Sequence, residues 1–139
     1  GEDKARLQSL INYEKLNRSV RLMPATSDIE NVYLGASVVA MSSHYEGLPM
    51  VLLEAQSFGL PIVAFACQCG PKDVITDGET GFLVPEGEVE GLADRLITLM
   101  EDDNLRLSMG KKAKEASHRY EERGVMQLWM ETFQTVMEQ

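Results

Sequence analysis

Two glutamates mark the stretch of this sequence whose residue types are best suited to chemistry. Glu46 and Glu54 stand eight positions apart in HYEGLPMVLLEAQSFGLP, residues 44–61, around Gly47 and Pro49. A carboxylate accepts hydrogen bonds from hydroxyl groups and can stabilise positive charge that develops on a substrate. Gly47 lets the backbone approach a ligand closely, and Pro49 is preorganised for the first turn of a helix. The stretch therefore predicts a ligand-binding loop that leads into a helix.

The helix predicted over residues 50–58 would hold an anion at its start. Its first-turn amides lack partners inside the helix, and the helix dipole favours negative charge there. Glu54 lies about 7.5 Å along the axis from Pro49, at about 1.5 Å per residue, while Glu46 precedes the helix. With a diphosphate between them, the carboxylates would accept hydrogen bonds from a sugar on one side and a ribose on the other. The same residues also fit a solvated loop charge at Glu46 and a paired charge within an apolar helix at Glu54.

Apolar runs and helical periods alternate along the chain, and this alternation indicates the fold. Ser27 and Glu30 have the spacing of a capping box, which predicts a helix start there. Strands that are apolar on both faces and alternate with helices predict a parallel sheet covered by helices on both sides, a Rossmann-like α/β domain. The predicted strands are residues 19–23, 37–42, 62–66 and 82–84, and the predicted helices are residues 3–16, 27–35, 50–58 and 71–75, followed by helical sequence from residue 89 onward.

Composition and charge limit the classes of function. At 139 residues the chain fits one compact domain, and its net charge of −9 argues against a nucleic-acid surface, which needs clustered Lys and Arg. No apolar run reaches the about 20 residues of a membrane-spanning helix. The first residues, GEDKARLQSL, lack the pattern of a secretory signal, so we expect a cytoplasmic location. To hold zinc, the C-x-C pair of Cys67 and Cys69 would need further ligands, and the only histidines are His44 and His118, so we expect no metal and two reduced, buried thiols.

The start of the sequence has the pattern of a strand-to-helix turn without its strand. Gly1 directly precedes a charged helical segment. A doubly wound sheet normally places its first strand centrally. The chain is therefore expected either to form an unusually small fold or to be a piece of a longer protein.

Three segments resemble one enzyme family, the retaining glycosyltransferases of family four. The run SSHYEGLPMVLLEAQSFGLPIVA, residues 42–64, resembles the E-x7-E signature of that family. NRSVRLMPATSDIENVYLGASVVAMSS, residues 17–43, and GPKDVITDGETGFLVPEGEVEGLADRLITLM, residues 70–100, resemble the segments on either side of it. The similarity covers nearly the whole chain, and the GPKDVI segment is most similar to bacterial polysaccharide enzymes that use UDP-sugars.

The resemblance implies a fold, a reaction and roles for individual residues. Such enzymes have the GT-B architecture of two facing Rossmann-like domains, and residues 1–139 would be the C-terminal, donor-binding one. The reaction implied is transfer of a sugar from a nucleotide-diphosphate sugar, UDP-sugar above all, to an acceptor hydroxyl in polysaccharide or glycolipid synthesis, with retention at the anomeric carbon. The resemblance implies neither a cofactor nor a metal. Carried over to this sequence, the catalytic carboxylate is Glu46, the donor sugar and diphosphate meet Gly47, Leu48 and Met50, the ribose meets Glu54, and the nucleobase meets Thr26. His44, two residues before Glu46, is a further candidate contact for the donor sugar and also fits a surface group.

Two parts of the family's pattern have no counterpart in the sequence. The Arg and Lys that neutralise the diphosphate come from a segment that would precede Gly1, and the acceptor-binding N-terminal domain is missing as well. We therefore expect a fragment that lacks its first strand, binds donor weakly and transfers nothing alone. The whole enzyme would use a glycan or lipid-linked acceptor and associate peripherally with the inner face of the membrane. Two other functions stay open, a catalytically silent nucleotide-sugar-binding module and a sugar-nucleotide epimerase of the same architecture.

Overall fold

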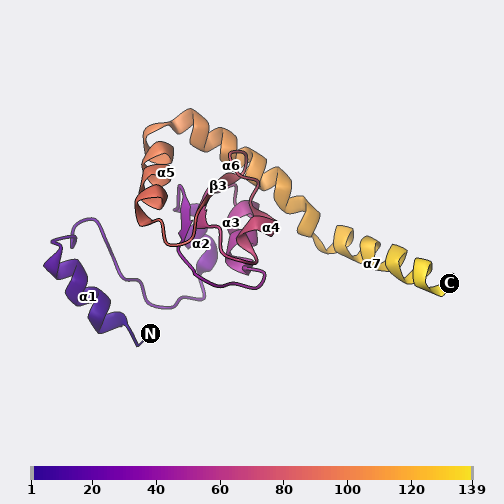
Figure 1. Cartoon of the computed structure of the whole chain (residues 1–139), viewed down its shortest axis with the longest axis horizontal. Coiled ribbons are helices and arrows are strands. Elements are labelled where there is room, and N and C mark those ends of the chain that lie inside the picture. Colours follow the sequence, from indigo (N-terminus) through magenta and orange to yellow (C-terminus); the bar gives the residue numbers. More distant parts are fainter. Residues whose placement is uncertain (1, 139) are drawn as a thin grey trace.

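Helices and short strands alternate along the chain, as Figure 1 shows for the computed structural model, which describes residues 2–138. The strands and the helices between them fall where the sequence predicts them, apart from the first predicted strand. In chain order the elements are α1 (Lys4–Tyr13), α2 (Ile29–Leu34), β1 (Val39–Met41), α3 (Met50–Ser57), β2 (Ile62–Phe65), α4 (Pro71–Val74), β3 (Gly81–Val84), α5 (Val89–Glu101), α6 (Asp103–Ser117), the 3-10 turn η1 (His118–Tyr120) and α7 (Glu122–Met137).

The strands form one parallel sheet in the order β1-β2-β3. Val39 of β1 pairs with Ile62 of β2, and Ile62 pairs with Gly81 of β3. A run of parallel strands that follow one another in chain order is one half of a doubly wound arrangement. The Rossmann-like prediction is confirmed, and the loops that follow the three strands share the carboxyl edge of the sheet.

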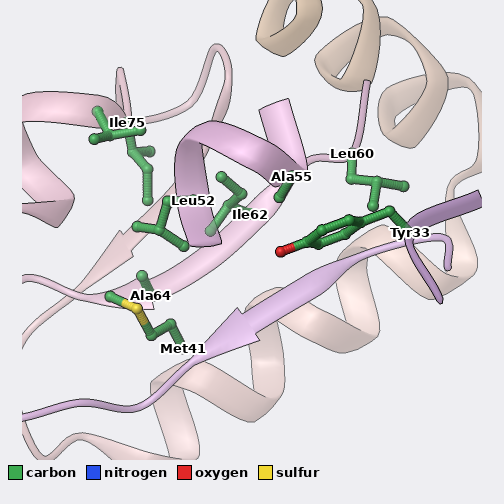
Figure 2. Packing of buried hydrophobic residues seen from close by; sticks show 9 residues of the cluster. Tyr33, Met41, Leu52, Ala55, Leu60, Ile62, Ala64 and Ile75 are labelled. Carbon is green, nitrogen blue, oxygen red and sulfur yellow. The ribbon is translucent and has the colours of Figure 1, made fainter. Parts of the chain in front are cut away.

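Strand β2 is buried along its whole length, as its apolar sequence predicts. Because alternate residues of a strand point to opposite faces, β2 contributes to two separate cores. The first core, drawn in Figure 2, joins the sheet to α2, α3 and α4, and the second joins it to α5 and α6. The first contains Ile62 and Ala64 with Tyr33, Met41, Leu52, Ala55, Leu60, Val74 and Ile75, and the second contains Val63 and Phe65 with Val84, Leu99 and Met109.

Helices α3 and α6 meet through two glycines. Gly59 follows the end of α3 with φ +73°, a conformation that L side chains rarely adopt. Gly110 lies inside α6, and a Cβ placed on it would stand 2.2 Å from the carbonyl oxygen of Gly59. Position 110 therefore admits only glycine at this spacing, and the two backbones are in direct contact.

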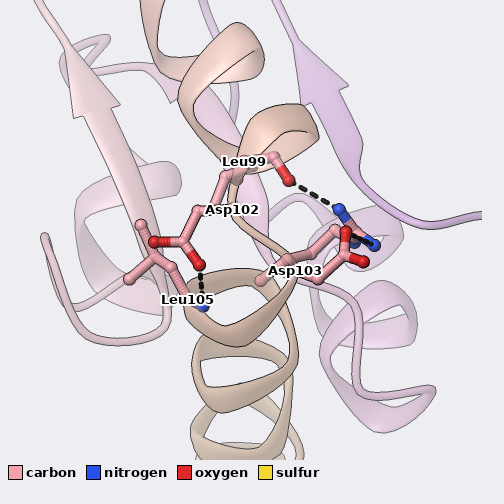
Figure 3. A network of polar contacts seen from close by, with 5 residues as sticks. Leu99, Asp102, Asp103 and Leu105 are labelled. Atoms are coloured by element: carbon pink, nitrogen blue, oxygen red, sulfur yellow. Dashed lines mark hydrogen bonds and ion pairs between the residues drawn. The ribbon is translucent and has the colours of Figure 1, made fainter.

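The corner between α5 and α6 is held by polar contacts, drawn in Figure 3. The carboxylate of Asp102 accepts the amide of Leu105 at 2.9 Å and so caps the start of α6. Arg106 donates to the carbonyl oxygen of Leu99 at 2.8 Å and pairs with Asp103 at 2.7 Å. These contacts fix the angle at which α6 turns back toward α3.

The first and last helices lie outside the two cores. Figure 1 shows α1 standing apart from the sheet and α7 extending away from it. No residue of α7 is buried, and its aromatic pair, Trp129 and Phe133, is 53% and 57% exposed. The apolar stripe of this helix is therefore a surface rather than part of a core. Between residues 2 and 138, no helix has the length and apolar character needed to span a bilayer.

The strand predicted over residues 19–23 is absent. This segment is irregular, Val20 and Met23 are 42% and 70% exposed, and within residues 2–138 β1 pairs only with β2. A β-strand needs a neighbour for its backbone hydrogen bonds. An apolar extended segment without such a neighbour does not become a strand, so this prediction is wrong.

The capping box predicted from Ser27 and Glu30 is also absent. The hydroxyl of Thr26 accepts the amide of Asp28 at 3.0 Å, and the helix begins only at Ile29. This local turn delays the helix, so Ser27 precedes the cap position instead of occupying it.

One of the two predicted buried thiols is exposed. Cys67 is buried and donates to the carbonyl oxygen of Cys69 at 3.4 Å, whereas Cys69 itself is exposed. The chain turns outward after Cys67 to begin the loop that leads to α4, which carries Cys69 to the surface. The strand-to-helix turn expected at Gly1 lies outside the described residues.

Candidate functional site

The loop after β1 delivers an open helix start at the carboxyl edge of the sheet. Pro49 is buried and directly precedes α3, with φ −75° and ψ 98°. Within the part of the chain that the structure describes, no side chain caps this end of the helix. The amides of Met50 and Val51 precede the first hydrogen bonds of the helical ladder, whereas the amide of Leu52 already bonds to the Pro49 carbonyl at 2.9 Å. The arrangement offers two outward amides and the positive end of a helix dipole to an anion.

The loop after β2 packs against the loop that precedes α3, and the contact is made at Gly70. Gly70 has φ +87°, and its amide donates to the carboxylate of Asp73 at 3.1 Å. A Cβ on Gly70 would lie 2.4 Å from the carbonyl oxygen of Gly47, 2.6 Å from Cδ of Pro49 and 3.3 Å from Cβ of Glu46. The absence of a side chain at position 70 thus lets two loops from neighbouring strands touch, and it holds the loop that carries Glu46 in place.

Glu46 stands beside the helix start with its charge unpaired among the described residues. The residue is half-buried, and between residues 2 and 138 its carboxylate makes no hydrogen bond or ion pair. Leu48 and Met50, which follow it, are 52% and 59% exposed. The Glu46 carboxylate is therefore free to accept hydrogen bonds from a ligand that approaches the start of α3.

Glu54 lies one turn into α3, and its side chain is exposed. Its charge therefore stays at the surface although the neighbouring residues in the sequence are apolar. The Tyr33 hydroxyl donates to Glu54 Oε2 at 2.8 Å, and the carbonyl oxygen of Val51 is a more distant acceptor at 3.4 Å. The Tyr33 side chain is buried and stacks on Phe58, with ring centroids 5.2 Å apart. Burial, with the hydrogen bond to Glu54 and its negative charge, raises the pKa of Tyr33 from 10.0 to about 12.

A cleft of about 260 Å³ opens on the outward side of Glu54, between α3 and η1. Glu54 is exposed, so one wall of the cleft is a carboxylate already held by a tyrosine. The two predicted carboxylates are therefore placed along one helix, one before its first turn and the other beside an open cleft. The cleft is lined by Met50, Leu53, Glu54, Ser57, Ser117, Tyr120 and Glu121.

His44 is joined to the third loop of the same edge. Its Nδ1 lies 2.9 Å from Glu86 Oε1, and its ring lies 6.1 Å from that of Phe65. His44 follows β1 and Glu86 follows β3, so this contact spans the loop after β2. The predicted contact of His44 with the donor sugar stays a prediction.

Thr26 is not gathered with the other predicted site residues. Its hydroxyl is engaged with the amide of Asp28, and it lines a separate pocket of about 690 Å³ beside α2. Tyr33 on the same helix reaches Glu54, so α2 lies between this pocket and α3. The predicted contact of Thr26 with a nucleobase also stays a prediction.

Basic residues and metal ligands contribute little to this edge within residues 2–138. Arg119 donates to the carbonyl oxygens of Asp73 and Val74, at 2.6 and 3.1 Å, and so binds the end of α4 to η1. Lys72 is exposed on α4. In this part of the chain no three His, Cys, Asp or Glu side chains are grouped to hold a metal ion.

Three residues that shape the site were missed by sequence reasoning. Tyr33 holds Glu54, Gly70 holds the loop of Glu46, and Glu86 holds His44. The Gly-Pro pair at 70–71 was a readable signal, because a glycine before a helix start often marks a close backbone approach. Tyr33 and Glu86 lie 21 and 42 positions from their partners, and no local pattern links residues so far apart.

Comparison with known protein families and curated proteins gives consistent matches. A profile described as glycosyl transferases group 1 matches residues 1–116. An uncharacterized glycosyltransferase of Haemophilus influenzae is 34% identical over 129 residues, which are 93% of this chain and 36% of that protein. The amylovoran biosynthesis glycosyltransferase AmsD of Erwinia amylovora has the same identity and coverage. An exopolysaccharide phosphotransferase of Streptomyces coelicolor is 37% identical over 96% of this chain, which spans only 14% of its length.

Solved structures share the fold closely. Anabaena HepE in complex with UDP superimposes with a TM-score of 0.87 over 94% of this chain and 36% of its own, at 27% identity. TarM, a protein of S. aureus, gives a TM-score of 0.88 over 96% of this chain and 27% of its own, at 28% identity. The C-terminal domain of LpcC from Francisella tularensis matches with a TM-score of 0.75 over 87% of this chain and 64% of its own, at 23% identity, which shows the fold alone.

Proposed function

Because the chain belongs to the glycosyl transferases group 1 family, we propose that it is the donor-binding domain of an enzyme that transfers a sugar from a nucleotide-diphosphate sugar. The observation that carries the proposal is the uncapped start of α3 between two carboxylates. Glu46, whose charge is unpaired among residues 2–138, precedes this start, and Glu54 faces a cleft one turn beyond it. A diphosphate with a sugar at one end and a ribose at the other has the same order of groups.

In the proposed complex the diphosphate contacts the backbone at the start of α3. The amides of Gly47, Leu48 and Met50 are its donors, since Pro49 has none. Glu46 accepts hydrogen bonds from hydroxyls of the transferred sugar, and Glu54 accepts them from the ribose. These contacts use carboxylates for hydroxyl groups and amides for phosphate, which is the pairing that charge dictates.

Two further contacts belong to the proposal. We expect His44, whose Nδ1 contacts Glu86, to meet the sugar with its other ring nitrogen, Nε2. Thr26 would meet the nucleobase through its backbone, because its hydroxyl is engaged with Asp28. No cofactor or metal is proposed, since the helix start and basic side chains are expected to balance the diphosphate charge.

For the whole protein we propose sugar transfer with retention at the anomeric carbon. The bond from the anomeric carbon to the diphosphate oxygen breaks, a bond to the acceptor oxygen forms on the same face, and the acceptor hydroxyl gives its proton to the departing nucleoside diphosphate. The start of α3 stabilises the negative charge that grows on the leaving group, and Glu46 stabilises positive charge on the sugar ring.

The chain spans no more than 36% of the length of the curated relatives described above, so acceptor binding is assigned to the rest of the protein. We assign this domain to the C-terminal part of the whole protein, as the family resemblance of residues 42–64 implies. The names of relatives that act in polysaccharide synthesis favour a glycan or lipid-linked acceptor. We propose a cytoplasmic enzyme that associates with the inner face of the membrane, of which the isolated domain binds donor and transfers nothing.

Titration of the 139-residue chain with UDP, GDP and ADP, followed by amide NMR, tests the proposed site. We expect one nucleotide, UDP first because HepE was solved with it, to shift the amides of residues 47–54. Glu54→Gln should weaken nucleotide binding, whereas Glu46→Gln should leave it unchanged and depress transfer by the whole enzyme. Glu101→Gln, at the exposed end of α5, is the matched control. No shift in residues 47–54 at millimolar nucleotide would overturn the assignment.

A second function, a nucleotide-sugar-binding module without transferase activity, is favoured by one observation. The Streptomyces coelicolor relative is named as a phosphotransferase, and this chain matches only 14% of its length. A domain of this kind thus occurs in a protein with a different named activity. Product analysis of the whole protein separates the possibilities: a transferase extends an acceptor, a silent module leaves the donor intact, and an epimerase releases a changed sugar nucleotide without any acceptor.

A further inference from the structure

Tyr33 reaches the proposed ribose carboxylate from a part of the chain that lies outside the E-x7-E segment. Its side chain leaves α2, passes through the first core and ends 2.8 Å from Glu54 Oε2 (Figure 2 shows the buried ring and its hydroxyl). The ring stacks on Phe58, which follows α3, with an interplanar angle of 22°. Only 5% of Tyr33 is exposed, so the position of its hydroxyl is set by packing on the ring.

The hydroxyl of Tyr33 has a single proton to donate, and Glu54 is its better acceptor. The carboxylate is charged and lies at 2.8 Å, whereas the Val51 carbonyl lies at 3.4 Å. The bond engages Oε2, whereas Oε1 of the same exposed carboxylate makes no hydrogen bond within residues 2–138, and Glu54 lines the cleft between α3 and η1. The raised pKa of Tyr33 means that the phenol stays protonated, and so remains a donor, throughout the neutral range.

We propose that Tyr33 is a positioning residue that holds the Glu54 carboxylate in the one orientation in which Oε1 can accept hydrogen bonds from ribose hydroxyls. The proposal rests on the proposed function, because it assigns Glu54 to the ribose of a nucleoside diphosphate. A glutamate side chain on a helix surface normally samples several rotamers and loses that freedom when it binds a ligand. With Tyr33 in place, the rotamer is already selected before the ligand arrives.

The consequence is specificity for ribose over deoxyribose. A fixed carboxylate discriminates against a sugar that lacks one hydroxyl, because its oxygen then loses a partner that it cannot replace by turning. A mobile carboxylate turns to water and loses less. Tyr33 is therefore expected to control the ratio of affinities for UDP and 2′-deoxy-UDP, while it leaves the contact with the diphosphate alone.

The test compares three ligands on the 139-residue chain by calorimetry or amide NMR: UDP, 2′-deoxy-UDP and inorganic pyrophosphate. Tyr33→Phe removes the hydroxyl and keeps the ring that stacks on Phe58. We expect it to weaken UDP binding about tenfold, the factor produced by about 1.4 kcal/mol, and to shrink the ratio of UDP to 2′-deoxy-UDP affinity by a similar factor. Pyrophosphate binding should not change. Tyr13→Phe, which alters an exposed tyrosine at the end of α1, should match the unmodified chain for all three ligands.

The outcomes separate this inference from the function on which it rests. If the unmodified chain binds no UDP at residues 47–54, the proposed function itself is lost. If it binds UDP and Glu54→Gln shrinks the ratio while Tyr33→Phe does not, Glu54 needs no positioning by Tyr33 and the inference is overturned. If Tyr33→Phe weakens all three ligands equally, its role is structural, and the inference is overturned as well.

A pH profile keeps the test decisive if Tyr33→Phe folds poorly. A trifluorinated tyrosine introduced at position 33 keeps the hydroxyl but ionises at a much lower pH. Burial and then Glu54 raise the pKa of Tyr33, and the ring itself packs among apolar residues of the first core and stacks on Phe58. The substituted chain should show the normal ratio of affinities at low pH and lose it as the fluorinated phenol ionises, because the phenolate cannot donate and repels Glu54. A ratio independent of pH contradicts the inference.

Discussion

At each end of helix α3 a glycine allows two backbone segments to come into close contact, but the two contacts have different roles. At its C-terminal end a Cβ on Gly110 would stand 2.2 Å from the Gly59 carbonyl oxygen, and at its N-terminal end a Cβ on Gly70 would stand 2.4 Å from that of Gly47. The first contact closes two helices onto each other. The second presses two loops together behind a helix start that stays open to solvent on its other side. A glycine contact therefore serves packing at one end and holds a ligand-binding backbone in place at the other.

The largest effect on stability is expected from Gly110→Ala. The new methyl group meets the backbone of Gly59, just after α3, which cannot turn aside as a side chain would. Overpacking of this kind costs about 3 kcal/mol, a large share of the stability of a small domain. Chemical denaturation followed by circular dichroism measures the loss. If Gly110→Ala proves as stable as the parent chain, the two backbones are not in the contact described.

Gly70→Ala is expected to lower stability less than Gly110→Ala and to weaken nucleotide binding more. Its methyl group meets a loop that can shift, but position 70 has φ +87°, so the substitution costs about 2 kcal/mol from strain and crowding together. The shifted loop carries Gly47 and Glu46, so UDP binding should fall by more than tenfold.

Gly78→Ala separates strain from crowding at position 70. Gly78 has φ +75°, and a Cβ there meets nothing within 4 Å. It should cost about 1 kcal/mol in the same denaturation experiment and leave UDP binding unchanged. Equal UDP affinities for both glycine variants would show that the contact between the loops does not support the site.

The stability of the folded chain is expected to depend on pH through Tyr33, whose hydroxyl contacts the middle of α3 at Glu54. Its pKa is raised from 10.0 to about 12 in the folded chain, chiefly by burial and then by Glu54. Below pH 10 the phenol is protonated in both states, and its contribution to stability is complete. Between pH 10 and 12 the unfolded chain loses this proton while the folded chain keeps it, so stability falls as the pH rises.

Tyr33→Phe should remove this part of the pH dependence. Urea unfolding of the two chains at several pH values from 9 to 12 measures the difference in slope, and subtracting the two curves cancels the titration of other tyrosines and of lysines. Parallel curves would mean that Tyr33 titrates like an exposed phenol.

The smallest effect is expected from Gly124→Ala in α7, and its sign is opposite. A Cβ at position 124 meets nothing within 4 Å, and alanine is the better helix former by about 0.8 kcal/mol. Helix content measured by circular dichroism should rise slightly, with no change in nucleotide binding. A loss of stability here would reveal a packing contact at this position, as at Gly110.

Local pattern was enough to predict most of the fold. Pro49 and Gly59 bracketed α3 correctly, and the apolar run at 62–66 correctly predicted the buried strand β2. Residues 19–23 show where such reasoning fails, because a strand depends on a neighbour that a local pattern does not reveal. Ser27 shows a second failure, since a competing hydrogen bond from Asp28 to Thr26 decided where α2 begins.

The sequence was enough to predict the carboxylates of the candidate site, but not the residues that hold them in position. The spacing of Glu46 and Glu54 around a predicted helix start placed both carboxylates near the carboxyl edge, and their roles toward a ligand stay predictions. Tyr33 could not be chosen from the sequence, because its contact with Glu54 joins residues 21 positions apart through a packed core. The exposure of Glu54 was equally hidden, since its neighbours in the sequence are apolar.

The order of the strands in the sheet has a consequence for folding during translation. Because β1, β2 and β3 pair in chain order, all the strands described for residues 2–138 have been synthesised once Val84 has left the ribosome, and so has every member of the first core. The second core waits for Leu99 and Met109. A nascent chain is therefore expected to pass through a stage in which Val63 and Phe65 are still uncovered. A pause in translation between residues 84 and 109 would prolong the exposure of this apolar, aggregation-prone surface.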